Sequence, residues 1–116
     1  MKLPGLEKAA VPERKVREYL LSRTHPGGRA KAAFFLGLGF RSGNWRELGK
    51  ALLRHAAEHE VAACEESRFG TRYVIDGRLN TPGGKHPVVR VIWFVDRGAG
   101  EPRLVTAYPG RQGAAP

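Results

Sequence analysis

The spacing of the apolar residues changes near residue 60, and this change restricts the fold more than any other feature of the sequence. Before it, apolar residues recur every three or four positions, as on one face of an α-helix. After it, they alternate with polar residues, which is typical of β-strands with one buried face. Helices followed by strands predict an α+β domain, in which the helices pack on one face of a sheet.

Helices are expected in the first half of the chain. Pro12 suits a first helical position, and Asn44 is a good N-terminal cap. Gly39 ends the helix between them. The predicted helices cover residues 12–22, 29–38 and 45–58, and the first of them turns Val16, Tyr19 and Leu20 inward.

The second half predicts strands joined by short turns. Gly70, the Asn80–Gly84 turn and the Gly98–Gly100 loop separate the apolar runs. Short connections favour a sequential antiparallel meander, so we expect about three N-terminal helices on one face of a four-stranded sheet. The predicted strands cover 61–69, 72–79, 88–96 and 103–108. The expected organisation is a lead-in over 1–11, one domain over 12–109 and a disordered tail over 110–116.

The last hairpin can be given a register. If Arg97 pairs with Glu101, alternation places Arg90, Thr106 and Tyr108 together on the sheet face away from the core. A slip of one residue would reverse this assignment. The predicted pairs are Arg90 with Tyr108, Ile92 with Thr106 and Phe94 with Leu104, and the predicted core side is Val89, Val91, Trp93, Val95, Val105 and Ala107.

The chain has a formal net charge of +9, from 20 Lys and Arg against 11 Asp and Glu. Such a surface attracts polyanions, and guanidinium groups match phosphate in two-point contacts. We therefore expect RNA as a partner, with an acidic protein, such as an antitoxin or immunity protein, or a basic surface without a partner as alternatives. The single cysteine excludes an internal disulfide. No stretch is long and apolar enough for a membrane span, and we expect a cytoplasmic protein.

The first candidate site is the turn His25-Pro-Gly-Gly-Arg-Ala-Lys31. A histidine can transfer protons near neutral pH, and the glycines allow close approach of the backbone to a ligand. Arg29 and Lys31 add positive charge for a phosphate. The alternative is a Pro-Gly turn whose histidine is only solvated.

The second candidate site lies on the last two strands. There Arg90 would stabilise negative charge on a phosphate, Thr106 would donate a hydrogen bond, and Tyr108 would stack on a base or donate from its hydroxyl. Arg103 would bind the phosphate backbone nearby. The alternative is a solvated sheet face.

His55 and His59 are four residues apart on the third predicted helix, a spacing that can bind a metal. Both lie at the edge of the apolar stripe, where a histidine commonly caps a core. No carboxylate completes a metal motif, so we expect neither a metal nor another cofactor.

The segment Arg103-Leu-Val-Thr-Ala-Tyr-Pro109, after a strand that carries Arg90, resembles the final strand of bacterial toxin nucleases grouped with barnase, EndoU and the colicin tRNA nucleases. This resemblance implies N-terminal helices before a four-stranded antiparallel sheet. It also implies a site built from helix-side and strand residues, here His25, Arg29, Lys31, Arg90, Thr106 and Tyr108. From Leu3 to Pro109, the chain also resembles a widespread bacterial family of unknown function, through its His25–Lys31 turn, Phe35, Gly39, Trp45 and last hairpin.

These observations favour a metal-independent, toxin-like endoribonuclease. The ribose 2′-hydroxyl would attack the neighbouring phosphate and leave a 2′,3′-cyclic phosphate, with His25 as general acid or base and Arg90 stabilising charge. The alternative function is a non-catalytic basic module that binds RNA or an acidic protein. Catalysis requires that His25 and the strand residues converge on one phosphate.

Overall fold

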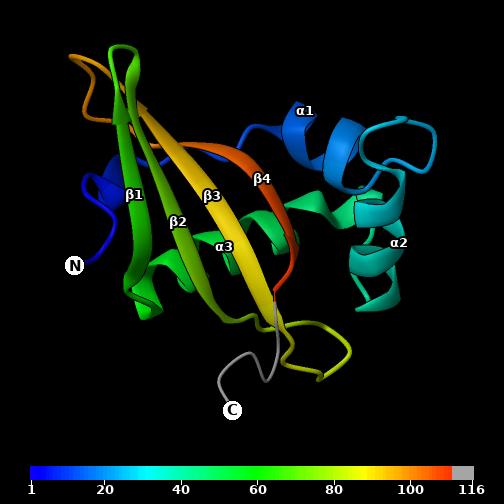
Figure 1. Ribbon diagram of the computed structural model, residues 1–116. Helices are drawn as coiled ribbons and strands as arrows, with labels where there is room; N and C mark the ends of the chain where they lie inside the picture. Colours follow the sequence, from blue (N-terminus) through cyan, green and yellow to red (C-terminus); the bar gives the residue numbers. More distant parts are fainter. Residues whose placement is uncertain (111–116) are drawn as a thin grey trace.

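A computed structural model describes residues 1–110 (Figure 1). The four strands form one antiparallel sheet in the order β1-β2-β3-β4, which confirms the α+β class and the meander. The helical elements are η1 (Leu6–Lys8), α1 (Glu13–Lys15), η2 (Val16–Leu20), α2 (Arg29–Gly37), η3 (Ser42–Asn44) and α3 (Trp45–Glu58). The strands are β1 (Val61–Ser67), β2 (Gly70–Arg78), β3 (Val88–Asp96) and β4 (Arg103–Pro109).

The core lies between the sheet and the helical layer. Figure 1 shows α3 crossing one face of the sheet, with α1 and α2 beyond the β4 edge. Trp93 of β3 and Leu48 and Leu52 of α3 are fully buried, as alternation and the helical period require. The N-terminal segment adds Leu3 to this core, and Ala10 forms a parallel bridge with Arg103.

The first predicted helix is present, but its second half has a different winding. After α1, the segment η2 is a π-helix in which the Leu21 N–H donates to the Val16 carbonyl. Val16 and Leu20 are fully buried, whereas Tyr19 is only half-buried. Short π-helical turns are frequent at functional sites, because they change the direction in which one side chain points.

The predicted register of the last hairpin is right for the pairs far from the connecting loop and wrong for the pair nearest to it. Arg90 faces Tyr108 and Ile92 faces Thr106, as predicted. A β-bulge then shifts the pairing, so Leu104 faces Trp93 instead of Phe94. The shift buries Leu104 in the core and leaves Val105 half-buried. Because of the bulge, Leu104 faces the core in place of the predicted Val105.

The predicted tail lies outside the described residues except for Gly110, whose N–H donates to the Val88 carbonyl at 2.9 Å. Within residues 1–110, the helices are too short or too polar to span a membrane.

Candidate functional site

An open hollow of about 610 Å³ lies where the α1–η2 segment meets β4. We call it the Tyr19 hollow, because Tyr19 is one of the residues that line it. His25 from the predicted turn and Thr106 from the last strand both line it, so the structure brings together two residues that are far apart in the sequence. The complete lining is Arg14, Lys15, Glu18, Tyr19, His25, Val105 and Thr106.

Positive groups surround the Tyr19 hydroxyl. The Lys31 ammonium donates a hydrogen bond to it at 2.8 Å, and the ammonium groups of Lys15 and Lys31 each lie 5.1 Å from the ring centroid. Burial raises the pKa of Tyr19, but the hydrogen bond from Lys31, the nearby Thr106 hydroxyl and the charges of Lys31 and Lys15 outweigh burial, and the pKa is lowered overall. The hydroxyl therefore gives up its proton more readily than an ordinary tyrosine.

The His25 imidazole is held in one orientation. Its ring meets the Tyr19 ring edge-on, with the centroids 5.1 Å apart, and its Nδ1 accepts a hydrogen bond from the Gly27 N–H at 3.0 Å. A neutral imidazole that accepts at Nδ1 carries its proton on Nε2. This Nε2–H has no hydrogen-bond partner among residues 1–110, so it is free to donate to a ligand.

Close packing fixes the turn that carries His25. The Ser22 hydroxyl oxygen accepts hydrogen bonds from the N–H groups of Thr24 and His25. A Cβ at Gly28 would overlap the Tyr19 carbonyl oxygen, so only glycine fits at this position. The glycines of the motif therefore allow the turn to lie directly against the residue that forms the hollow.

Strand β4 contributes two residues to the hollow at its β-bulge. Val105 is the extra residue on β4, and both Val105 and Thr106 line the hollow. The Thr106 hydroxyl is close enough to Tyr19 to help lower its pKa. It is buried and has no hydrogen-bond partner within the described residues. A buried hydroxyl without a partner is unfavourable, and a bound ligand with an acceptor oxygen would satisfy it.

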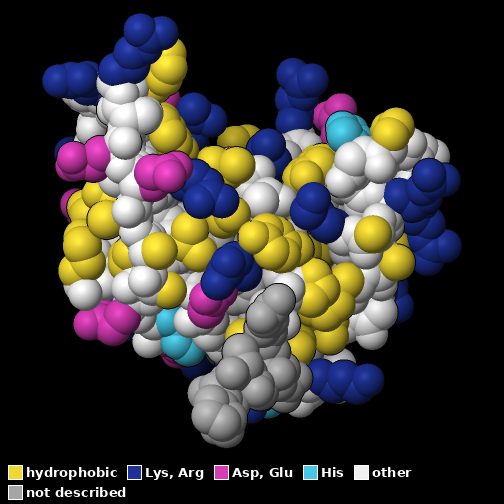
Figure 2. Space-filling view, in the orientation of Figure 1, with side chains coloured by type: hydrophobic (Ala, Val, Ile, Leu, Met, Phe, Trp, Pro, Cys, Tyr) yellow, Lys and Arg dark blue, Asp and Glu magenta, His cyan; other side chains and the backbone are white. Residues whose placement is uncertain are grey.

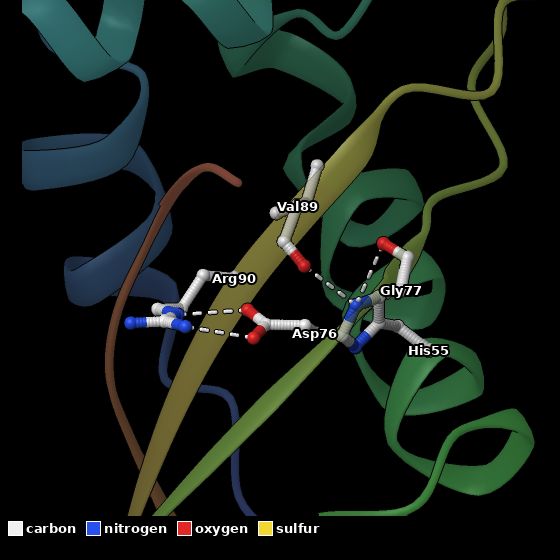
Figure 3. A network of polar contacts seen from close by, with 5 residues as sticks. All are labelled: His55, Asp76, Gly77, Val89 and Arg90. Atoms are coloured by element: carbon white, nitrogen blue, oxygen red, sulfur yellow. Dashed lines mark hydrogen bonds and ion pairs between the residues drawn. The ribbon is translucent and has the colours of Figure 1, made fainter. Parts of the chain in front are cut away.

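Arg90 does not line the Tyr19 hollow. Figure 3 shows its guanidinium group against the Asp76 carboxylate, with two hydrogen bonds of 2.7 and 2.8 Å across β3 and β2. This contact raises the pKa of Arg90 and lowers that of Asp76. Tyr108 lies opposite Arg90 on β4. The charge of Arg90 is therefore largely balanced within the protein.

The other predicted phosphate ligands lie in three different environments. Lys31 belongs to the Tyr19 hollow through its hydrogen bond to Tyr19. Arg103 forms two hydrogen bonds with the Asp96 carboxylate and lies over the Phe94 ring. Arg29 lines a separate hollow. The predicted set is thus divided between the Tyr19 hollow, the open sheet face and the surface of α2.

The two histidines of α3 connect this helix to the sheet. His55 is buried, and its Nε2–H donates to the carbonyls of Val89 at 2.9 Å and Gly77 at 3.2 Å (Figure 3). Burial lowers the pKa of His55. The His59 Nε2–H donates to the Arg78 carbonyl at 3.0 Å. In the part of the chain that the structure describes, no three His, Cys, Asp or Glu side chains gather as metal ligands would.

The α1–η2 segment supplies four residues of the hollow that the sequence analysis does not place in a site, namely Arg14, Lys15, Glu18 and Tyr19. Tyr19 occupies a position of the apolar stripe, and this position predicts a core residue. A tyrosine hydroxyl near a core requires a polar partner, and this requirement was the one available signal. Glu18 lies on the exposed side of the same helix and pairs with Arg14 at 3.7 Å, a separation that only the fold reveals.

Comparisons with known proteins agree with this architecture. Among solved structures, the chain is similar to a chain of the contact-dependent growth inhibition toxin–immunity protein complex from Klebsiella pneumoniae 342, with a TM-score of 0.71 and 16% identity. The similarity covers 93% of this chain and 98% of that chain, and at this identity it shows the fold. A comparison with curated proteins found no match. Residues 2–111 match a family described as "Domain of unknown function (DUF6883)", and the chain belongs to this family.

Proposed function

We propose that this protein is a metal-independent, toxin-like endoribonuclease and that the Tyr19 hollow is its active site. The observation that carries the proposal is the convergence of His25, Lys31 and Thr106 around a tyrosine with a lowered pKa. Perturbed titratable groups in a concave site are typical of catalytic centres. The hollow is open and its polar groups are mainly donors, which suits an anionic polymer.

The scissile phosphate would lie among four groups that donate hydrogen bonds or carry positive charge. These are the ammonium groups of Lys15 and Lys31, the His25 Nε2–H and the Thr106 hydroxyl. They face the oxygens on which negative charge increases in the transition state. We assign no chemical step to Arg90, because Asp76 already balances its charge.

The hydrogen-bonded pair of Tyr19 and Lys31 would transfer the protons. The phenolate oxygen of Tyr19 takes the proton of the ribose 2′-hydroxyl, and the 2′-oxygen forms a bond to phosphorus. The bond from phosphorus to the 5′-oxygen breaks, and this oxygen takes a proton from the Lys31 ammonium. The products are a 2′,3′-cyclic phosphate and a 5′-hydroxyl. A proton then moves from Tyr19 to Lys31 along their 2.8 Å hydrogen bond and restores both groups.

The test is cleavage of bulk RNA in the presence of a chelator, with end-group analysis of the products. We expect the wild type to leave 2′,3′-cyclic phosphates. Tyr19→Phe and Lys31→Met should each reduce the rate by about 10²–10⁴-fold, because each removes a proton-transfer group. Lys85→Met is the matched control, since it removes an ammonium group from an exposed turn that does not line the hollow, and it should retain activity. Full cleavage by both Tyr19→Phe and Lys31→Met would exclude the mechanism.

The structural neighbour also supports a protein partner. That neighbour is one chain of a toxin–immunity protein complex, and the present chain has a similar fold and a net charge of +9. Figure 2 shows Lys and Arg side chains spread over the sheet face opposite α3 and around the helical end of the molecule. We therefore propose that an acidic inhibitor protein covers the Tyr19 hollow, because charge complementarity speeds association and selects the partner.

The second candidate function is a non-catalytic module that binds RNA. The exposed position of His25 and the cations that have no ion pair are compatible with binding alone. In the same assay, intact RNA together with binding that weakens as salt increases would favour this function.

A further inference from the structure

We infer that a second hollow, on the other side of the 22–28 turn, binds the RNA backbone next to the cleaved phosphate; the inference rests on the proposed function. This arginine hollow has a volume of about 890 Å³ and lies between the turn, α2 and η3. Arg23, Arg29 and Arg41 line it, and Leu21, Ala33 and Leu36 form its apolar surface.

The charge of this hollow is not balanced locally. No carboxylate lines it, and neither Arg23 nor Arg29 forms an ion pair within residues 1–110. Arg41 is fixed in place, because its Nη1 donates to the Leu36 and Phe40 carbonyls at 2.9 and 2.8 Å. Three guanidinium groups without acidic neighbours form a surface that attracts phosphate.

The position of the hollow indicates an extended polyanion. Arg23 and His25 lie two residues apart on one turn, and Arg23 lines the arginine hollow while His25 lines the Tyr19 hollow. Arg29 and Lys31 are likewise two apart at the start of α2; Arg29 lines the arginine hollow, and Lys31 donates a hydrogen bond to Tyr19. A single strand that crosses the turn would therefore contact both hollows.

RNA fits this surface better than an acidic protein segment does. A strand that places one phosphate beside His25 and continues across the turn places the next phosphates near Arg23, which is exposed. The apolar surface of Leu21, Ala33 and Leu36 can pack against ribose and base. Every nucleotide of an RNA strand has both of these groups beside its phosphate. An acidic protein segment could bind the arginines, but its binding would not require the arginine hollow to lie next to the Tyr19 hollow.

The experiment measures binding of a fluorescent 2′-O-methyl RNA oligonucleotide, which cannot be cleaved, by anisotropy at several salt concentrations. The variant is Arg23→Gln with Arg29→Gln, and Arg41 is left intact because it caps α2. We expect Kd to rise about tenfold or more, and the slope of log affinity against log salt to fall by about 1.4 for two lost phosphate contacts.

The matched control is Lys8→Gln with Lys85→Gln, which removes the same charge from two exposed sites that have no ion pair in the described part of the chain. Arg23→Lys with Arg29→Lys should retain much of the affinity, because it keeps the charge. An equal loss in the test variant and the control would overturn the inference. Loss of binding to a polyglutamate peptide with unchanged RNA binding would also overturn it, in favour of an acidic protein partner.

The two proposals fail separately. If the wild type leaves RNA intact but the arginine variant still loses affinity for the oligonucleotide, the arginine hollow is supported and the nuclease mechanism is excluded. If the wild type cleaves RNA and the arginine variant binds the oligonucleotide as the control does, the nuclease is supported and the arginine hollow is excluded.

Discussion

The Tyr19 hydroxyl has two ammonium groups near it and accepts a hydrogen bond from one of them. Burial opposes ionisation, but the positive groups win, and the pKa of Tyr19 is lowered. We predict that a spectrophotometric titration of the tyrosines shows one ionisation step below the ordinary pKa of tyrosine, about 10. Lys31→Met should raise the pKa of this tyrosine, because it removes both the hydrogen bond and a nearby charge.

Tyr19→Phe identifies the residue in this titration, since the first ionisation step should disappear in that variant. Tyr108→Phe is the control and should leave the step in place. If the early step remains in Tyr19→Phe, Tyr19 has no lowered pKa and is not suited to accept the 2′-hydroxyl proton.

The ion pair of Asp76 with Arg90 makes a prediction about stability. The hydrogen bond from Arg90 lowers the pKa of Asp76, so the pair stabilises the fold above the pKa of an unfolded aspartate, about 3.9. This contribution is lost as the pH falls through the lowered value. Asp76→Asn should therefore cost about 1 kcal/mol of unfolding free energy near neutral pH, because both side chains are partly exposed.

Urea unfolding of the wild type and Asp76→Asn at neutral and strongly acid pH measures this difference. The gap between the two proteins should close in acid. An equal gap at both pH values would show that the pair does not stabilise the fold through its charges.

Helix α3 is attached to the sheet through the buried His55, whose Nε2–H donates to carbonyls of β2 and β3. Burial lowers its pKa, so the folded protein keeps it neutral at pH values where the unfolded chain binds a proton. Stability is therefore highest above the unfolded pKa of about 6.5 and decreases as the pH falls below it. His55→Ala should cost about 2–4 kcal/mol at mildly alkaline pH, from the cavity and the lost hydrogen bonds.

The same variant should remove most of the pH dependence between mildly alkaline and mildly acid solution. His86→Ala, in an exposed turn, is the control and should change neither the stability nor its pH dependence. If His55→Ala keeps the wild-type pH dependence, another group is responsible for it.

The elements themselves follow from local sequence pattern. The third helix lies over the predicted residues 45–58, and the third strand over 88–96. The bulge in β4 does not follow from pattern, because Leu104 and Val105 are both apolar and a regular strand can bury only one of the two. Packing decides between them, since Leu104 fills the core opposite Trp93. The π-helical winding of η2 does not follow from pattern either, because buried residues four apart, such as Val16 and Leu20, fit an ordinary α-helix equally well.

The arrangement of the site depends on contacts between distant segments. His25, Lys31 and Thr106 were identified from residue type, but their convergence requires η2 to lie beside β4. The pairing of Arg90 with Asp76 was within reach of sequence reasoning, because the two residues are directly opposite in the β2–β3 register. A register for that hairpin would have shown that the guanidinium group has a partner in the protein.

The net charge of +9 makes a last prediction, about the nucleic acid that the protein binds. Contacts to phosphate are the same in RNA and single-stranded DNA, so both should bind with similar salt dependence. If about five phosphates are contacted, affinity for either should fall about a hundredfold between about 50 and about 200 mM salt. Only RNA should be cleaved, because the proposed reaction begins at the 2′-hydroxyl. Binding that does not change with salt would show that the charge is not used to hold nucleic acid, and cleavage of DNA would exclude attack by the 2′-oxygen.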